Sequence, residues 1–136
     1  MLCGHNVHEN VGRTQQGGTS LLLYGPLIDQ YNFEASGKDD AGLGRWVVMV
    51  FRGSEGITTR VICGYNPCVS NVRARHSLYQ QHRRYFIEKE KDTTCPRRRF
   101  HDDLTRQLQQ WRAAGDRLIV FMDANEDIYK KSMAKL

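Results

Sequence analysis

The sequence predicts a mixed α/β fold, in which an early antiparallel pair of strands is followed by a helical crossover to a further strand. Two apolar stretches, residues 45–52 and 58–64, flank a short turn containing two glycines and are expected to pair as a hairpin. Two helical stretches then precede five consecutive apolar residues, 118–122, which predict a fully buried strand. Strands packed beneath helices in this order indicate an α/β sandwich.

The N-terminal third is expected to contribute little regular structure. Residues 1–16 are polar and irregular, and residues 17–25 form a strand that opens with a glycine pair and stops at Gly25 and Pro26. Glycine, serine and aspartate cluster within residues 27–44, which predicts a long, mobile loop before the hairpin.

The crossover between the hairpin and the last strand is expected to hold two helices. The first covers residues 74–90, and a break containing Cys95 and Pro96 separates it from the second, residues 98–114. The second helix carries one apolar stripe, spaced 4, 4 and 3 residues apart, which predicts packing against the core: Phe100, Leu104, Leu108 and Trp111. Gly115 is expected to cap its C-terminus.

The last predicted strand delivers Asp123 and Asn125 to its C-terminal end, where α/β sheets place their ligands. A carboxylate there can accept a proton or orient a water molecule, and a carboxamide can donate a hydrogen bond to an oxyanion. The alternative is that Asp123 caps a following helix, because Asp is favoured at that position.

The second strand of the hairpin ends in a Tyr65-Asn66-Pro67 turn, where proline stops the ladder of backbone hydrogen bonds. Tyr65 is therefore a second candidate for chemistry at a strand end. The alternative is that its ring packs the turn.

Composition limits the chain to one domain, residues 1–136, of a soluble globular type: 40% of residues are hydrophobic and the mean hydropathy is −0.60. No apolar run approaches the roughly 18–20 residues of a membrane span, and the N-terminus lacks the pattern of a signal peptide, so we expect an intracellular protein, nuclear or cytoplasmic. The four cysteines form no tight pair, which favours free thiols over a zinc site.

The net charge of +5 is concentrated in one segment. Residues 73–106 contain ten Lys and Arg against five Asp and Glu, a difference that equals the excess of the whole chain. Such a basic segment suggests a polyanionic partner, which we expect to be a nucleic acid, namely DNA. The alternative is a solvated helical surface that is basic without a partner.

The order of these motifs resembles the endonuclease/exonuclease/phosphatase superfamily, the deoxyribonuclease I-like proteins, which include the endonuclease domains of non-LTR retrotransposons. The shared features are the Gly17-Gly18 strand, a strand bearing Trp46, the strand ending in Tyr65-Asn66-Pro67, and the strand ending in Asp123-Ala124-Asn125. The resemblance covers about residues 15–128. It implies part of a four-layer αββα sandwich and a Mg²⁺-dependent phosphodiesterase, namely an endonuclease that hydrolyses DNA.

The resemblance also implies roles for individual residues. Asp123 would orient or deprotonate the attacking water, Asn125 would hydrogen-bond a non-bridging phosphate oxygen, and Tyr65 would lie at the phosphate. Asn66 is a weaker candidate at the same place.

Two further side chains, Arg73 and Arg75, follow the Tyr65 turn and would contact a DNA or RNA backbone. Glu126 is either a metal ligand or an acid in the first turn of a following helix.

The sequence departs from the family in three places. Met122 replaces the glycine that precedes the Asp-x-Asn motif, and no strand ending in Gln-Glu precedes Gly17, where Glu9 is the only carboxylate. The family's closing Asp-His pair is absent after residue 126. We therefore expect a partial domain with outer segments missing, inactive and marginally stable in isolation. The alternative function is a non-catalytic basic module that binds nucleic acid or protein.

Overall fold

The structure is a computed structural model that describes residues 2–5, 17–25, 32–53, 55–71 and 76–126. These residues form a mixed α/β fold. Its strands are β1 (Leu2–His5), β2 (Ser20–Leu23), β3 (Asn32–Lys38), β4 (Trp46–Arg52), β5 (Thr58–Tyr65) and β6 (Arg117–Asp123). Its helices are α2 (Leu78–Tyr85), the π-helical turn η1 (Phe86–Glu90) that continues it, and α3 (Pro96–Ala113).

Four strands make the main sheet, in the order β3-β4-β5-β6. The pairs β3–β4 and β4–β5 are antiparallel, whereas β6 runs parallel to β5. A parallel neighbour requires a crossover, and α2, η1 and α3 supply it. The predicted hairpin and the predicted helical crossover are therefore both confirmed.

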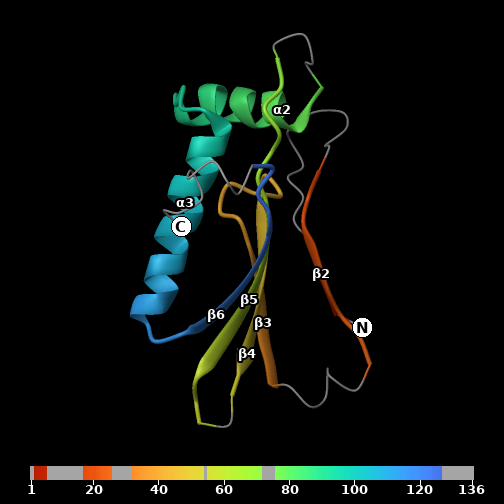
Figure 1. Ribbon diagram of the computed structural model, residues 1–136, viewed down its shortest axis with the longest axis vertical. Coiled ribbons are helices and arrows are strands. Elements are labelled where there is room, and N and C mark those ends of the chain that lie inside the picture. The colour runs from red at the N-terminus through yellow and green to blue at the C-terminus, as the bar shows by residue number, and fades with distance from the viewer. Residues whose placement is uncertain (1, 6–16, 26–31, 54, 72–75, 127–136) are drawn as a thin grey trace.

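Helix α3 covers one face of this sheet and completes the core (Figure 1). Phe100 and Leu104 are fully buried, and the rings of Phe100 and Trp46 meet edge to face with their centroids 6.0 Å apart. Leu108 and Trp111 pack at the margin of the same cluster, so the predicted apolar stripe is confirmed. From the sheet, the buried core members are Trp46, Val48, Val50 and Ile62.

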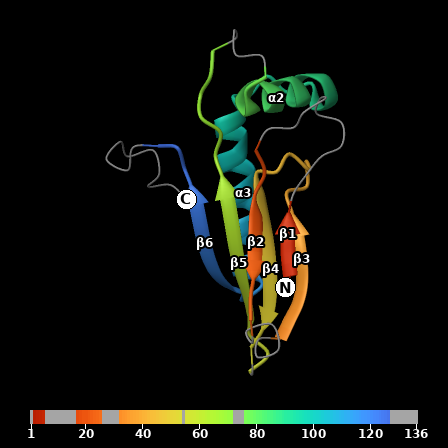
Figure 2. The ribbon, with the colours of Figure 1, turned by 90° about the vertical axis from the view of Figure 1, so that its right-hand side faces the viewer.

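The opposite face is only partly covered. The antiparallel pair β1–β2 lies over β3 and β4, and β6 lies beyond its reach (Figure 2). Ile119 and Phe121 of β6 are 46% and 58% exposed, so the prediction of a fully buried final strand is wrong. The five apolar residues belong to an edge strand, which has one neighbour in the four-stranded sheet.

The prediction of a loop over residues 27–44 is also wrong, because strand β3 lies within this range and pairs with β4 along the whole length of β3. Its sequence mixes polar, small and charged residues and so lacks the alternation that marks a strand. The ladder with β4 supplies the order instead, and Gly37 allows close approach: a Cβ there would lie 2.9 Å from Cγ1 of Val48. Residues 2–5, predicted irregular, form β1.

Both helices begin at residues that favour a helix N-terminus. Ser77 caps α2 by accepting a hydrogen bond from the backbone N–H of Gln80, so the helix starts later than the predicted residue 74. Helix α3 starts at Pro96, earlier than predicted, because the missing N–H and fixed φ of proline suit the first helical position. Within the described residues, no helix combines the length and apolar character needed to cross a bilayer.

Gly115 ends α3 as predicted. Its φ is +88°, its N–H donates to the carbonyl of Arg112, and the N–H of Asp116 donates to the carbonyl of Trp111. This pair of hydrogen bonds is a Schellman motif, which satisfies carbonyls left unpaired at a helix end and requires a left-handed residue. The motif turns the chain sharply into β6.

Candidate functional site at the ends of β5 and β6

The parallel pairing of β5 and β6 brings two predicted site residues together. Tyr65 and Asp123 are register partners, each the last residue of its strand. One residue further on, the backbone N–H of Asn66 donates to the carbonyl of Asp123 over 2.9 Å. The two motifs therefore meet at the C-terminal edge of the sheet, an arrangement that the resemblance implies.

Asn125 is held in a turn just beyond this edge. Its φ of +48° lies in the left-handed region, which asparagine tolerates better than most residues. Its N–H donates to Oδ1 of Asp123 (3.1 Å), and its Nδ2 donates to the carbonyl of Asn66 (2.7 Å). The thiol of Cys68 donates to its Oδ1 (2.8 Å). Contacts to both strand ends thus fix the orientation of the carboxamide.

Asn66 supports the site from within. It is fully buried, and its Nδ2 lies 3.1 Å from Nε2 of His101, on α3. Among the described residues, its side-chain oxygen has no hydrogen-bond partner. In this conformation Asn66 contacts protein, and a contact with nucleic acid would require the turn to open.

Arg97, in the first turn of α3, links the two strand ends. Its Nη1 donates to the carbonyls of Pro67 (3.1 Å) and Asn125 (3.2 Å). Its Nη2 donates to the carbonyl of Ala124 (3.4 Å) and to Oε1 of Glu126 (2.6 Å). Sequence reasoning counted Arg97 only as part of the basic segment. No local pattern marks it, because the crossover alone brings α3 to this edge.

Glu126 is engaged by this contact. Its carboxylate pairs with Arg97, and Nε2 of His101 lies 3.5 Å from the same oxygen. A helix after Glu126 would lie outside the described residues, and so does Glu9. The carboxylate of Glu126 is thus held by the protein in this structure.

Asp123 is the exposed carboxylate at this edge. Within the described ranges, His, Cys, Asp and Glu side chains nowhere gather in threes that could hold a metal ion. Magnesium needs one or two carboxylates together with waters or substrate phosphates. Glu126, the next acid along the chain, is held by Arg97, so the described residues do not by themselves make a complete Mg²⁺ site.

A small hollow of about 260 Å³ adjoins Tyr65, and Gly17, the first residue of the glycine pair, lies at its margin. Gly17 has a φ of +84°, and a Cβ there would lie 2.7 Å from Cδ2 of Leu78. The Gly-Gly motif and the Tyr65 turn, distant in sequence, are therefore neighbours. Around the hollow lie Gly17, Tyr65, Cys68, Ser70, Ser77, Leu78 and Tyr79.

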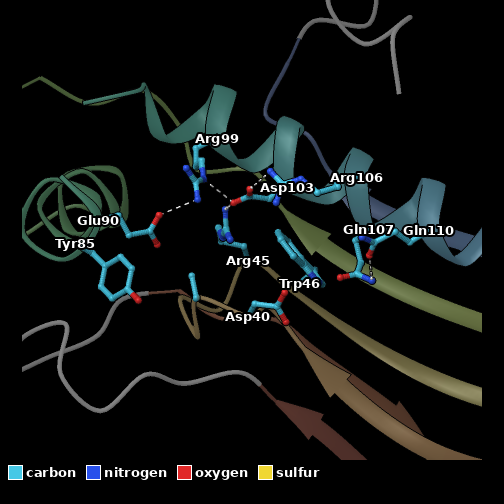
Figure 3. A pocket seen from close by; sticks show the side chains of 11 residues that line it. Asp40, Arg45, Trp46, Tyr85, Glu90, Arg99, Asp103, Arg106, Gln107 and Gln110 are labelled. Atoms are coloured by element: carbon cyan, nitrogen blue, oxygen red, sulfur yellow. Dashed lines mark hydrogen bonds and ion pairs between the residues drawn. The ribbon is translucent and has the colours of Figure 1, made fainter. Parts of the chain in front are cut away.

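A second hollow, of about 270 Å³, lies between the β3–β4 connection and the helices (Figure 3). Arg45, 2% exposed, forms ion pairs with Asp39 (2.7 Å) and Asp103 (2.8 Å). Burial alone would lower the pKa of Arg45, but the hydrogen bonds and charges of Asp39 and Asp103 raise it above its usual value. Arg99 joins the network through Glu90 and Asp103. The charges of this cluster pair with one another. Because the pairs join Arg45, which precedes β4, to side chains of α3 and η1, the cluster connects the helices to the sheet.

The arginines of the basic segment that lie in α3 are paired with acidic side chains. Four of its arginines form ion pairs with acids of the chain: Arg97, Arg98, Arg99 and Arg106. Exposed Arg83 of α2 and Lys89 of η1 have no ion pair shown in the described part of the chain. Arg73 and Arg75, the predicted nucleic-acid contacts, lie outside the described residues.

Comparison with protein families, with curated protein sequences and with solved structures gives no match to this chain. The resemblance to deoxyribonuclease I-like proteins thus stays a prediction that rests on the motifs and their order.

Proposed function

We propose that Tyr65, Asp123 and Asn125 form the strand-end part of a metal-dependent phosphodiesterase site that acts on DNA, within a partial αββα sandwich. The observation that supports this most is the parallel register in which Tyr65 and Asp123 are partners at the C-terminal edge of the sheet. Ligands of α/β sheets bind at this edge.

Each residue has a chemical task that its surroundings allow. The exposed carboxylate of Asp123 orients or deprotonates the attacking water. Asn125 has two N–H donors on its carboxamide, of which one is committed to the carbonyl of Asn66, and the other donates to a phosphate oxygen. Tyr65 places its hydroxyl group beside the phosphate. A Mg²⁺ ion would supply charge neutralisation on the phosphate when bound, and Asp123 is the described carboxylate that would help to hold it.

The test is Mg²⁺-dependent nicking of a supercoiled plasmid. It uses the product of the full open reading frame that encodes this sequence. We expect measurable nicking that needs added Mg²⁺ and is abolished by Asp123→Ala. Asp102→Ala, an exposed carboxylate of α3, is the matched control and should retain activity. Nicking that Asp123→Ala leaves unchanged would refute the proposal.

The second candidate is a non-catalytic module that binds a polyanion. It is favoured by two exposed basic side chains, Arg83 of α2 and Lys89 of η1. Helix α2 lies beyond the strand ends, at one end of the molecule (Figure 1). Affinity for a labelled duplex should then fall by about 0.9 log units per log unit of salt for each phosphate neutralised. Arg83→Ala should reduce that slope by about one phosphate, with no nicking by any variant; a salt-independent affinity excludes this candidate.

A further inference from the structure

We infer that Arg97 is a positioning residue that holds Asn125 in the orientation needed to donate to a phosphate oxygen. The inference rests on the proposed function, because it assigns to Arg97 a task within that site. Arg97 itself makes no contact with the substrate in this scheme; it acts through the turn at residues 124–126.

The geometry of the guanidinium group carries the inference. Its two terminal nitrogens reach three backbone carbonyls and one carboxylate, at distances from 2.6 to 3.4 Å. The carbonyl of Pro67 belongs to the turn after β5, whereas those of Ala124 and Asn125 belong to the turn after β6. One side chain from α3 therefore fastens both turns to the same helix end.

The contact is also shielded from water. The side chains of Arg97 and Glu126 are only 12% and 15% exposed. Hydrogen bonds from an ionised donor to an ionised acceptor are stronger than neutral ones, and limited solvent contact reduces their screening. The pair is thus a firm anchor, unlike the Arg98–Asp102 pair one residue further along α3, which is 3.8 Å apart and exposed.

The turn at Asn125 needs such an anchor. Its φ of +48° is less favourable than ordinary backbone conformations, and β6 is an edge strand without an outer neighbour. If Arg97 is removed, the carbonyl of Asn125 loses its donor, and the turn can relax toward negative φ. That relaxation would rotate the carboxamide away from the carbonyl of Asn66.

The shape of the guanidinium group leads to a specific prediction. Lysine carries one ammonium group and cannot span both turns as a planar guanidinium does. We therefore expect Arg97→Lys to behave like Arg97→Ala, and free guanidinium ion to restore part of what Arg97→Ala loses.

The structural test is NMR of the 136-residue chain, which reports on Asn125 whether or not the chain is active. In Arg97→Ala, the backbone and side-chain NH₂ signals of Asn125 should shift, and its protection from solvent exchange should fall about tenfold, the equivalent of about 1.4 kcal/mol. Guanidinium chloride at a sub-denaturing concentration should reverse the change. Arg98→Ala, the control, should leave these signals in place. Unchanged Asn125 signals in Arg97→Ala would overturn the inference.

The functional test uses plasmid nicking by the product of the full open reading frame, compared with its Asp123→Ala variant. A misplaced carboxamide should lower kcat by about 100-fold with KM nearly unchanged, since small misplacements of a catalytic group cost about that much. Perturbed Asn125 signals accompanied by unchanged nicking would also overturn the inference. Nicking that is insensitive to Asp123→Ala would instead refute the proposed function, and the NMR result would then show separately whether Arg97 holds the turn.

Discussion

The buried pair of Asp39 and Arg45 offers the sharpest test of how this fold is held together. We expect Asp39→Ala to be among the most destabilising single changes in the chain. The carboxylate of Asp39 accepts hydrogen bonds from the backbone N–H groups of Ala41, Leu43 and Arg45, and from Nε and Nη2 of Arg45. It therefore both shapes the β3–β4 connection and neutralises the guanidinium group.

The expected magnitude follows from burial. The side chains of Asp39 and Arg45 are 0% and 2% exposed, so the substitution would leave a buried cation with Asp103 as its remaining acidic partner. Removing one partner of a buried ion pair costs about 3–5 kcal/mol, a large share of the roughly 5–15 kcal/mol that stabilises an ordinary domain. With a urea m-value of about 2 kcal/mol/M, the unfolding midpoint should fall by about 2 M.

The assay is equilibrium unfolding in urea, followed by the fluorescence of Trp46 and Trp111 and by circular dichroism. Asp102→Ala is the matched control, because its pair with Arg98 is exposed and should contribute less than about 0.5 kcal/mol. Asp39→Asn keeps the side-chain volume and covers the case in which Asp39→Ala does not fold. A loss below about 1 kcal/mol in both Asp39 variants would refute this reasoning.

Three further outcomes are expected. Burial, followed by the charge of Arg45, lowers the pKa of His82 to about 4, so the unfolded chain takes up a proton at a higher pH than the folded chain does. The free energy of unfolding should therefore fall by roughly 3 kcal/mol as the pH drops from above 6.5 to 4. Urea titrations of His82→Gln should lack this loss, whereas those of His76→Gln, at an exposed position, should show it. Gly115→Ala should cost about 1–2 kcal/mol in thermal unfolding, because its φ of +88° strains any side chain; a smaller loss would contradict the Schellman assignment. Phe121→Ser should change the free energy of unfolding by less than about 0.5 kcal/mol, because Phe121 is exposed, whereas Phe100→Ala should cost about 3–5 kcal/mol, because Phe100 is buried. A loss for Phe121→Ser as large as that for Phe100→Ala would mean that β6 is buried.

Local signals in the sequence were sufficient for several elements. The spacing of Phe100, Leu104, Leu108 and Trp111 predicts the buried face of α3, since a helix repeats every 3.6 residues whatever it packs against. Gly115 predicts the end of that helix, because the left-handed conformation at a C-cap favours glycine by its own backbone sterics. These features depend on neighbours in sequence, so sequence alone reveals them.

The misjudged elements depend on partners distant in sequence. Strand β3 has no alternation of its own and is ordered by its ladder with β4. The apolar run of β6 predicts a strand correctly but not its burial, because burial depends on how far the β1–β2 pair extends over the sheet. Similarly, Asp39 appears in the sequence as an ordinary loop residue and Arg45 as the first residue of a strand, and no local pattern marks them as a buried ion pair.

For the candidate site, the sequence determined which residue types end the strands, and the tertiary structure decided how they are arranged. Strands ending in Tyr65 and in Asp123-x-Asn125 are apparent from residue types, because strand and turn preferences are local. That Tyr65 and Asp123 become register partners depends on the parallel pairing of β5 with β6. The role of Arg97 depends on the path of the crossover, which returns α3 to the same edge. A side chain that acts on backbone carbonyls leaves no pattern in the sequence, since every residue has a carbonyl; only folding shows which ones it reaches.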